Sequence, residues 1–368
     1  METLRIDAGR LHRFVAATFA AAGCRPEEAD RVAAGLVDAN LTGHDSHGVV
    51  RVPRYIEWLA TGIVDAGRTV SVAVDNGGMA VLDGHYGFGA SVGREAVAFG
   101  IARAKSHGAA VIALRHAGHL GRIGQWAEMA LAEALVSLHI VNVAGSTLVA
   151  PFGGADRRFS TAPIAFGFPV PDEPPVVLDF ATSAVAEGKV LVASKGGKPV
   201  PDGSLIGPDG RLSADPTVLY GPLETNGLRD HSNGTGAIRA MGDHKGSGLA
   251  LMCELLAGAF TGSGCSGPQR HRFANGMVSV YLSPDAFGSA STLAADTREF
   301  IDYVRNSRPA EAGGSVLLPG DPERTARRDR LAHGVPLTGE TLASLRTAAQ
   351  AAGLAADDPS MQLHPAPP

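Results

Sequence analysis

Residues 43–55, GHDSHGVVRVPRY, gather more titratable side chains than an ordinary solvated loop requires. Arg51 follows His47 by four residues, so both side chains can lie on the same side if the next helix begins early. A guanidinium binds a carboxylate through two parallel hydrogen bonds, and an imidazole can exchange the proton that accompanies hydride transfer to a carbonyl. The spacing therefore predicts a site for a small 2-oxo acid.

The histidines also form two HxxH pairs, His44 with His47 and His116 with His119. Imidazole is the commonest metal ligand, so a metal-dependent enzyme that uses these pairs is an alternative. Both pairs are expected in glycine-flanked loops, however, and not on the regular helix of a zinc-binding H-E-x-x-H motif. A lone histidine is usually a hydrogen-bonded structural residue, but the company of Arg51 favours substrate chemistry here, without a metal.

A glycine-rich segment, GFGASVG at 87–93, has a spacing close to that of a Rossmann dinucleotide turn. Such a turn lies inside a β-α-β unit and is followed about 20 residues later by an acid. Here the segment follows a predicted hairpin, and the downstream residues IARAKSHGAA contain no acid. We therefore do not expect a Rossmann dinucleotide turn at this segment.

Composition and charge restrict the class of protein. The 368 residues carry a formal net charge of −5 and no basic block, which argues against nucleic-acid binding. The N-terminal residues lack the apolar core of a signal peptide, and no run of about 18 apolar residues is present to span a membrane. The three cysteines suggest no disulfide or zinc framework, so a reducing compartment, the cytoplasm, is expected.

Apolar periodicity and turn residues predict an α/β chain whose strands and helices do not alternate evenly enough for a doubly wound fold. Helices are expected at 7–22, 26–41, from about 53, at 90–107, 122–134, 245–262 and 293–307, with two more near the C-terminus. Strands are expected at 109–115, 136–143, 174–183, 277–284 and 315–321, and a hairpin at 71–84. Residues 195–216 are expected to form loops and a short ribbon, and the end of the chain to be mobile.

Seven ordered blocks resemble those of the malate/L-lactate dehydrogenase family that is unrelated to the Rossmann lactate dehydrogenases. This family includes ureidoglycolate, sulfolactate, 2,3-diketogulonate and piperideine/pyrroline-2-carboxylate reductases. The resemblance covers about residues 5–353. The blocks are SHGVVRVPRY (46–55), GHLG (118–121), APFGG (150–154), STAP (160–163), LDFATS (178–183), GDHKGSGLALMCELLAG (242–258) and LPGD (318–321).

The resemblance implies a non-Rossmann, mixed-sheet domain that binds NAD or NADP, and a helical domain built from both chain ends. The implied divisions are an N-terminal helical part at 1–70, the cofactor-binding domain at 71–290, C-terminal helices at 291–353 that pack with the N-terminal part, and a mobile tail at 354–368. It further implies a homodimer that transfers a hydride between the cofactor and a small anionic 2-oxo or 2-hydroxy acid, or a cyclic 2-imino acid.

By similarity, the substrate-contacting or catalytic residues would be Ser46, His47, Arg51, Tyr55 and His119. Arg51 would hold the carboxylate, and either histidine could be the proton donor. The cofactor would be contacted by His119, Gly145, Ser146, Thr161, Asp179, Phe180, Ala181, Thr182, His244, Lys245, Pro319, Gly320 and Asp321.

These implied cofactor contacts have simpler alternatives. Thr182 could be no more than a helix N-cap, Lys245 an exposed lysine, and LPGD a turn. This chain also departs from the family, with Ala162 where asparagine is usual, and with Ala117, Ala144 and Gly145 near the two expected loops. A non-catalytic dinucleotide-binding protein is therefore a further alternative. The choice between NAD and NADP stays open at this point.

Overall fold

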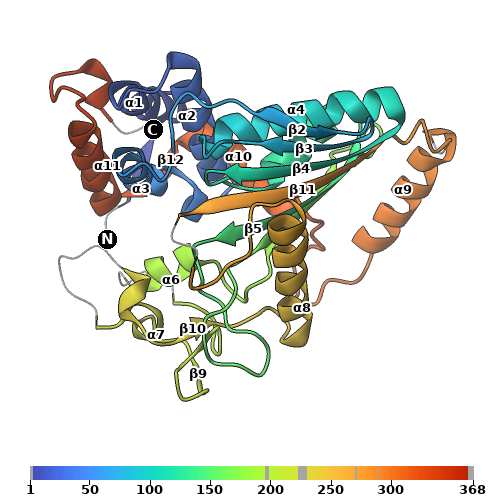
Figure 1. The fold of residues 1–368 in the computed structure, drawn as a ribbon. Helices are drawn as coiled ribbons and strands as arrows, with labels where there is room; N and C mark the ends of the chain where they lie inside the picture. Colours follow the sequence, from blue (N-terminus) through green and yellow to red (C-terminus); the bar gives the residue numbers. More distant parts are fainter. Residues whose placement is uncertain (1–2, 195–198, 223–229, 270–271, 289, 364–368) are drawn as a thin grey trace.

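A seven-stranded mixed sheet occupies the centre of the computed structural model, in the strand order β2-β3-β4-β11-β5-β6-β7 (Figure 1). The structure describes residues 3–194, 199–222, 230–269, 272–288 and 290–363. The central strands β4 (Ala109–Ala117), β11 (Ala274–Leu282) and β5 (Val136–Ala144) are rich in small and branched apolar residues. Such residues suit strands that are covered on both faces.

The sheet is mainly antiparallel, which separates this fold from a doubly wound one. The hairpin of β2 (Ser71–Asp75) and β3 (Met79–Asp83) forms where it was predicted, around Asn76 and Gly77. Strand β11 pairs antiparallel with both β4 and β5, and β6 (Pro163–Phe168) and β7 (Val176–Ala181) continue the sheet in the same manner. The predicted fold class, a non-Rossmann mixed sheet beside a helical domain, is confirmed.

The glycine-rich segment 87–93 lies in a different context from the one expected. Strands β3 and β4 are parallel neighbours joined by α4 (Gly89–His107), so the segment opens the helix of a β-α-β unit. Two of its glycines nevertheless allow α4 to pack closely against residues 119 and 120. A Cβ at Gly89 would lie 2.1 Å from the carbonyl oxygen of His119, and one at Gly93 would lie 2.7 Å from Leu120. The helix therefore begins pressed against the loop that carries His119.

Helices cover both faces of the sheet. On one face α4 and α5 (Gly124–Leu131) bury a core with β3, β4, β5 and β11. On the other face α8 (His244–Cys253) packs on β5 and β6, and continues as a π-helical turn at Glu254–Phe260. The apolar helix predicted at 245–262 is therefore present, with its second half wound more loosely than an α-helix.

The helical domain is built from both chain ends. Helices α1 (Ala8–Ala21), α2 (Pro26–Leu41) and α3 (Val52–Ala60) share one core with α11 (Gly339–Ala351). The short strands β1 (Thr3–Ile6) and β12 (Val335–Thr338), which the sequence analysis missed, pair antiparallel and tie the two ends together. Because strands of four residues carry little periodicity, they were not recognisable alone.

Three expectations for the C-terminal quarter need correction. Residues 315–319 form no strand, because the segment runs as an irregular connection into α10 (Asp321–His333). Helix α9 (Ala290–Arg305), expected to pack with the N-terminal helices, lies at the opposite side of the molecule (Figure 1). Met361 and Leu363 are buried in the helical core, so residues 354–363 are not a free tail, while 364–368 lie outside the described residues.

A smaller lobe lies between β7 and α8 in the chain. It contains α6 (Glu187–Ser194), α7 (Thr217–Tyr220), a 3-10 turn at His231–Asn233 and a three-stranded ribbon of β8 (Leu205–Ile206), β9 (Leu212–Ser213) and β10 (Ala237–Ile238). The ribbon predicted within 195–216 is present, and residues 195–198 of that stretch lie outside the described residues. The lobe has its own apolar core.

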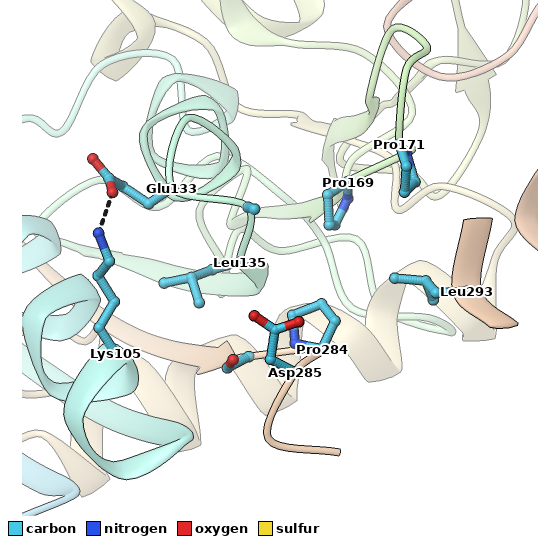
Figure 2. Close-up of a pocket in the computed structure, with 10 residues that line it drawn as sticks. Lys105, Glu133, Leu135, Pro169, Pro171, Pro284, Asp285 and Leu293 are labelled. Carbon is cyan, nitrogen blue, oxygen red and sulfur yellow. Dashed lines mark hydrogen bonds and ion pairs between the residues drawn. The ribbon is translucent and has the colours of Figure 1, made fainter. Parts of the chain in front are cut away.

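A pocket of about 330 Å³ opens at the far end of the sheet (Figure 2). It is lined by Leu135, Pro169, Pro171, Leu293 and the ion pair of Lys105 with Glu133. Leu135 directly precedes β5, and Pro284 follows the end of β11. The two histidine loops lie at the other ends of these strands. The pocket is therefore remote from the two histidine loops. No helix in the described part of the chain is both long and apolar enough to cross a membrane.

Candidate active site

Two successive 3-10 turns shape the segment that drew attention in the sequence. Asp45–His47 and Val49–Arg51 form one turn each, and the extended Gly48 between them redirects the chain. Helix α3 begins at Val52, directly after Arg51, with proline in its first turn. His47 and Arg51 thus lie on consecutive turns and not on one regular helix, but the charge of Arg51 still acts on the His47 ring.

The side chains of His47 and His119 meet across the boundary between the helical domain and the sheet. Their rings stack with centroids 5.6 Å apart and an angle of 16° between planes. Tyr55, on α3, completes the group, since its hydroxyl lies 2.6 Å from Nδ1 of His119. Three residues that are up to 72 positions apart in the sequence therefore lie side by side.

Burial keeps both imidazoles neutral. It lowers the pKa of His47 well below the usual range, and the nearby His119 and Arg51 lower it further. Burial likewise lowers the pKa of His119 to about 3, with Arg51 acting in the same direction. The phenol of Tyr55, only 5% exposed, has its pKa raised by burial and stays protonated. An anionic substrate close to these rings would favour their protonated forms.

The guanidinium of Arg51 is fixed on two sides. Its Nε donates to the carbonyl oxygen of Ser46 at 2.6 Å, and its Nη2 lies 3.4 Å from a carboxylate oxygen of Glu187. The Ser46 hydroxyl lies 3.0 Å from Nδ1 of His47. These contacts leave part of the guanidinium free for a bidentate partner such as a carboxylate.

Glu187 and Tyr220 are site residues that the sequence analysis missed. Glu187 opens α6, and its second carboxylate oxygen accepts a hydrogen bond from the buried Tyr220 at 2.5 Å. The adjoining Gly188 allows close approach, because a Cβ there would lie 2.2 Å from that of Ser46. Glu187 and Arg51 are 136 positions apart in sequence, and no local pattern indicates that they meet.

Asp179 lies in the second half of β7, beside the start of α5. One of its carboxylate oxygens accepts the backbone N–H of Gly124 at 2.7 Å, and burial raises its pKa. Next to it, Arg122 is held by Asp38 at 2.9 Å and by Glu128. The buried Nε and Nη1 of Arg122 have no hydrogen-bond partner among the described residues, and Nη1 points toward Gly124.

Several of the residues expected to bind the cofactor lie toward the end of the sheet that carries His119, whereas Pro319 to Asp321 lie beside the start of β7. Thr182 is buried, and its N–H and hydroxyl both donate to the carbonyl oxygen of Thr161. Gly145, at φ 84°, packs on the backbone of Arg272 and Phe273, and Phe273 lies beside the His119 ring. Ser146 follows in the same loop. Phe180 and Ala181 are half-buried in β7, next to Asp179.

Other expected cofactor residues lie at two helix N-termini. His244 and Lys245 open α8 and are exposed, and Met241, just before them, donates its N–H to Thr182. At α10, Pro319 accepts from Val177 on β7, and Gly320 adopts the left-handed conformation. Asp321 accepts from Leu318 N–H at 2.8 Å and pairs with Arg324, so its carboxylate already stabilises the turn.

The two HxxH pairs are not used as pairs. His44 points to Glu323 at 3.3 Å, while His47 faces His119. His116, at φ 52°, lies 3.2 Å from Asp83 at Nδ1 and stacks on Tyr86. Within the described part of the chain, no three histidine, cysteine, aspartate or glutamate side chains gather as a metal site. The departures Ala117, Ala144 and Ala162 are buried core positions.

Comparison with known proteins gives one consistent result. The family model for malate/L-lactate dehydrogenase matches residues 6–346. The chain is 38% identical to hydroxycarboxylate dehydrogenase B of Escherichia coli O157:H7 over 95% of each chain. It is 31% identical to a pyrroline-2-carboxylate/piperideine-2-carboxylate reductase of Pseudomonas putida, over 93% and 96% of the two chains. The malate dehydrogenase structure from Pyrococcus horikoshii superposes with a TM-score of 0.83 at 26% identity, covering 96% and 97%.

Proposed function

Because this chain belongs to the malate/L-lactate dehydrogenase family, it is an oxidoreductase of 2-hydroxy acids that uses a nicotinamide cofactor, and we propose that His119, Arg51 and Tyr55 carry its chemistry. The observation that carries the proposal is the contact between Tyr55 and His119, 2.6 Å long, next to the stacked His47 and within the field of Arg51. The substrate would be a small 2-oxo or 2-hydroxy acid, or a cyclic 2-imino acid.

Arg51 binds the substrate carboxylate in this proposal. Its guanidinium is already oriented by Ser46 and Glu187, so little side-chain entropy is lost when the substrate arrives. A carboxylate that reaches Arg51 lies beside the two neutral imidazoles. The carbonyl or imine carbon next to that carboxylate is then held close to a group that can exchange a proton.

His119 exchanges the proton at the substrate oxygen, or at the nitrogen of an imino acid. The hydroxyl of Tyr55 would accept from Nδ1–H of His119 both in the neutral ring with a bare Nε2 and in the imidazolium, so the contact is kept as the proton moves. Nε2 then accepts a proton from a hydroxy acid, or donates one during reduction. His47, stacked on His119 and hydrogen-bonded to Ser46, helps to exclude water and contacts the substrate.

The residues at the sheet end suit a dinucleotide. Asp179 presents a half-buried carboxylate with one oxygen engaged by Gly124, which suits hydrogen bonds from a ribose. The buried cation of Arg122 lies beside it and is paired with Asp38 and Glu128. Lys245 stands at the start of the ten-residue helix α8, where a phosphate is favoured. The nicotinamide supplies or accepts the hydride when bound.

We favour NAD over NADP as the cofactor, with Asp179 as the reason. An acid that receives a ribose diol disfavours a phosphate on the same ribose. This proposal is independent of the chemistry at His119. Turnover that is at least tenfold more efficient with NADPH than with NADH would contradict it.

We also propose a cytoplasmic homodimer. Phe166 and Leu178 form an exposed cross-strand pair on the sheet face that α8 covers in part. Leu251, Met252 and Leu255, on the outer side of α8 and its π-helical turn, are exposed as well. Such a run of large apolar residues on neighbouring elements supports an interface between copies of the chain.

The proposed activity is tested by mixing the protein with NADH or NADPH and a panel of 2-oxo acids and cyclic imino acids, and following the nicotinamide absorbance. Turnover that disappears in His119→Ala supports the proposal. No turnover with any substrate and either cofactor, from a folded protein, would show that the proposed chemistry is wrong.

A further inference from the structure

Each histidine of the site lies on a loop that is hydrogen-bonded to a buried asparagine, and we propose that Asn40 and Asn275 are positioning residues for His47 and His119. Asn40 is 1% exposed and Asn275 is 2% exposed. Neither belongs to the residues that touch the two imidazoles. Each uses its amide oxygen to accept a backbone N–H within two residues of the histidine on its loop.

Asn40 spans the turn that carries His47. Its Oδ1 accepts the N–H of Val49 at 2.8 Å, and its Nδ2 donates to the carboxylate of Asp45 at 2.6 Å. Gly48 lies directly over the amide, since a Cβ there would come within 2.2 Å of Asn40 Oδ1. One rigid side chain from the end of α2 therefore fixes the chain on both sides of His47.

Asn275 serves the other loop from the sheet. It lies where the register of β11 shifts between Asn275 and Met277, an irregularity that turns the side chain out of the regular ladder. Its Oδ1 accepts the N–H of Leu120 at 2.9 Å, and its Nδ2 donates to the carbonyl oxygen of Asn142 at 3.0 Å. Leu120 directly follows His119, so the loop is fastened next to the imidazole.

A buried polar network supports Asn275 from behind. The side chain of Asn142 accepts the N–H of Gly276 at 3.0 Å and donates to Glu254 at 3.2 Å. Glu254, 4% exposed at the start of the π-helical turn, also accepts from the N–H and the hydroxyl of Ser266, both at 2.8 Å. Fully hydrogen-bonded networks of this kind are rigid. The His119 loop is therefore connected through Asn275 and Asn142 to Glu254, in the π-helical turn that follows α8.

Only a neutral amide fits both positions. An aspartate at 40 would bring a second carboxylate against Asp45, and an aspartate at 275 would turn an oxygen toward the carbonyl of Asn142. A leucine fills a similar volume but leaves the N–H of Val49 or Leu120 buried without an acceptor. Since displacements of about 1 Å at a reacting group cost on the order of a hundredfold in rate, loss of either amide should reduce turnover.

The experiment compares Asn40→Leu and Asn275→Leu with Ser279→Ala. Ser279 is a matched control, because it is buried on the same strand as Asn275 and hydrogen-bonds His139, away from both loops. Hydrogen exchange by mass spectrometry should show faster exchange at 44–51 in Asn40→Leu and at 117–121 in Asn275→Leu. Ser279→Ala should leave both segments protected.

The kinetic arm rests on the proposed function. Each leucine variant should lower kcat by about tenfold to a hundredfold and change the KM for the cofactor by less than about threefold. If a leucine variant does not fold, Asn40→Ala and Asn275→Ala, which also remove the amide oxygen, replace it. Unchanged loop exchange, or unchanged kcat in a folded variant, would overturn the proposal. An inactive parent protein would contradict the proposed function alone, since the exchange data remain readable.

Discussion

The two histidine loops are each hydrogen-bonded to a buried asparagine, but their imidazoles contact different side chains. The His47 loop belongs to the helical domain, and its imidazole contacts the Ser46 hydroxyl next to it in the chain, at 3.0 Å. The His119 loop belongs to the sheet, and its imidazole contacts Tyr55 from the other domain, at 2.6 Å. Tyr55 is buried and stays protonated, so its hydroxyl can hold Nδ1 of His119 while the other ring nitrogen exchanges a proton. We therefore propose that His119 exchanges the proton and that His47 contacts the substrate.

The largest expected effect separates the two imidazoles directly. His119→Ala should lower kcat by about a thousandfold, the usual loss for a general acid or base. His47→Ala should lower kcat/KM by about tenfold, because it removes contacts and not the proton path. Steady-state kinetics at saturating cofactor give both values. If His47→Ala proves the more damaging change, the roles are reversed.

Arg51 tests the part of the site that both loops share. Arg51→Leu should raise the KM for the 2-oxo acid by about a hundredfold, because the carboxylate loses its bidentate, charge-assisted partner. Arg51→Lys should recover only part of the loss, since an ammonium cannot bind with two parallel hydrogen bonds. Substrate titrations supply the KM values. An equal KM in all three proteins would place the carboxylate elsewhere.

The partners of the two imidazoles should differ in importance. Tyr55→Phe removes the hydroxyl that contacts His119 and should lower kcat by about thirtyfold. Ser46→Ala removes the hydroxyl that contacts His47 and should cost no more than about threefold. Thermal unfolding of both variants serves as the control for structure. Similar losses of kcat would erase the distinction between the loops.

The free energy of unfolding should fall at acidic pH because of the two site histidines and of His139, which is fully buried in the sheet. Burial lowers the pKa of His139 from its usual 6.5 to about 3, so the unfolded chain binds this proton first as the pH falls. The contribution of neutral His139 to the free energy of unfolding is fully present above pH 6.5. It is lost as the pH falls toward 3, at about 1.4 kcal/mol per pH unit. His47 and His119 act in the same direction.

Urea denaturation at pH 7.5, 6 and 5 measures this loss for the parent protein and for His139→Gln. The variant should lose less free energy of unfolding per pH unit, because one proton fewer is taken up on unfolding. Identical slopes would show that His139 does not contribute.

The smallest expected effect concerns the carboxylate beside Arg51. Glu187 shares the guanidinium with any incoming substrate carboxylate. Glu187→Gln should therefore lower the KM for the 2-oxo acid by about threefold, a modest value for a partly exposed ion pair. Tyr220→Phe, which leaves the charge of Glu187 in place, is the matched control. A KM that rises in Glu187→Gln would mean that the carboxylate orients Arg51 more than it competes.

Local chemistry made a large part of the fold predictable. The hairpin at 71–84, the helix at 26–41 and the strand at 136–143 carry turn residues or apolar periodicity within their own span, and each is present. The prediction of a strand at 315–321 was wrong, because the periodicity of a short apolar run does not distinguish a strand from an irregular connection. The parallel pairing of β3 with β4 was also invisible, since pairing is not a local property.

The sequence by itself determined the kinds of group in the site, because the residue types from Ser46 to Tyr55 and at His119 already specify an anion-binding guanidinium and proton-exchanging rings. The tertiary structure alone decided which groups meet. It placed Tyr55 on His119, Glu187 on Arg51, and Asn40 and Asn275 behind the two loops. The physical reason is that a hydrogen bond between residues far apart in the chain forms only after the packing of helices and sheet has brought both partners together.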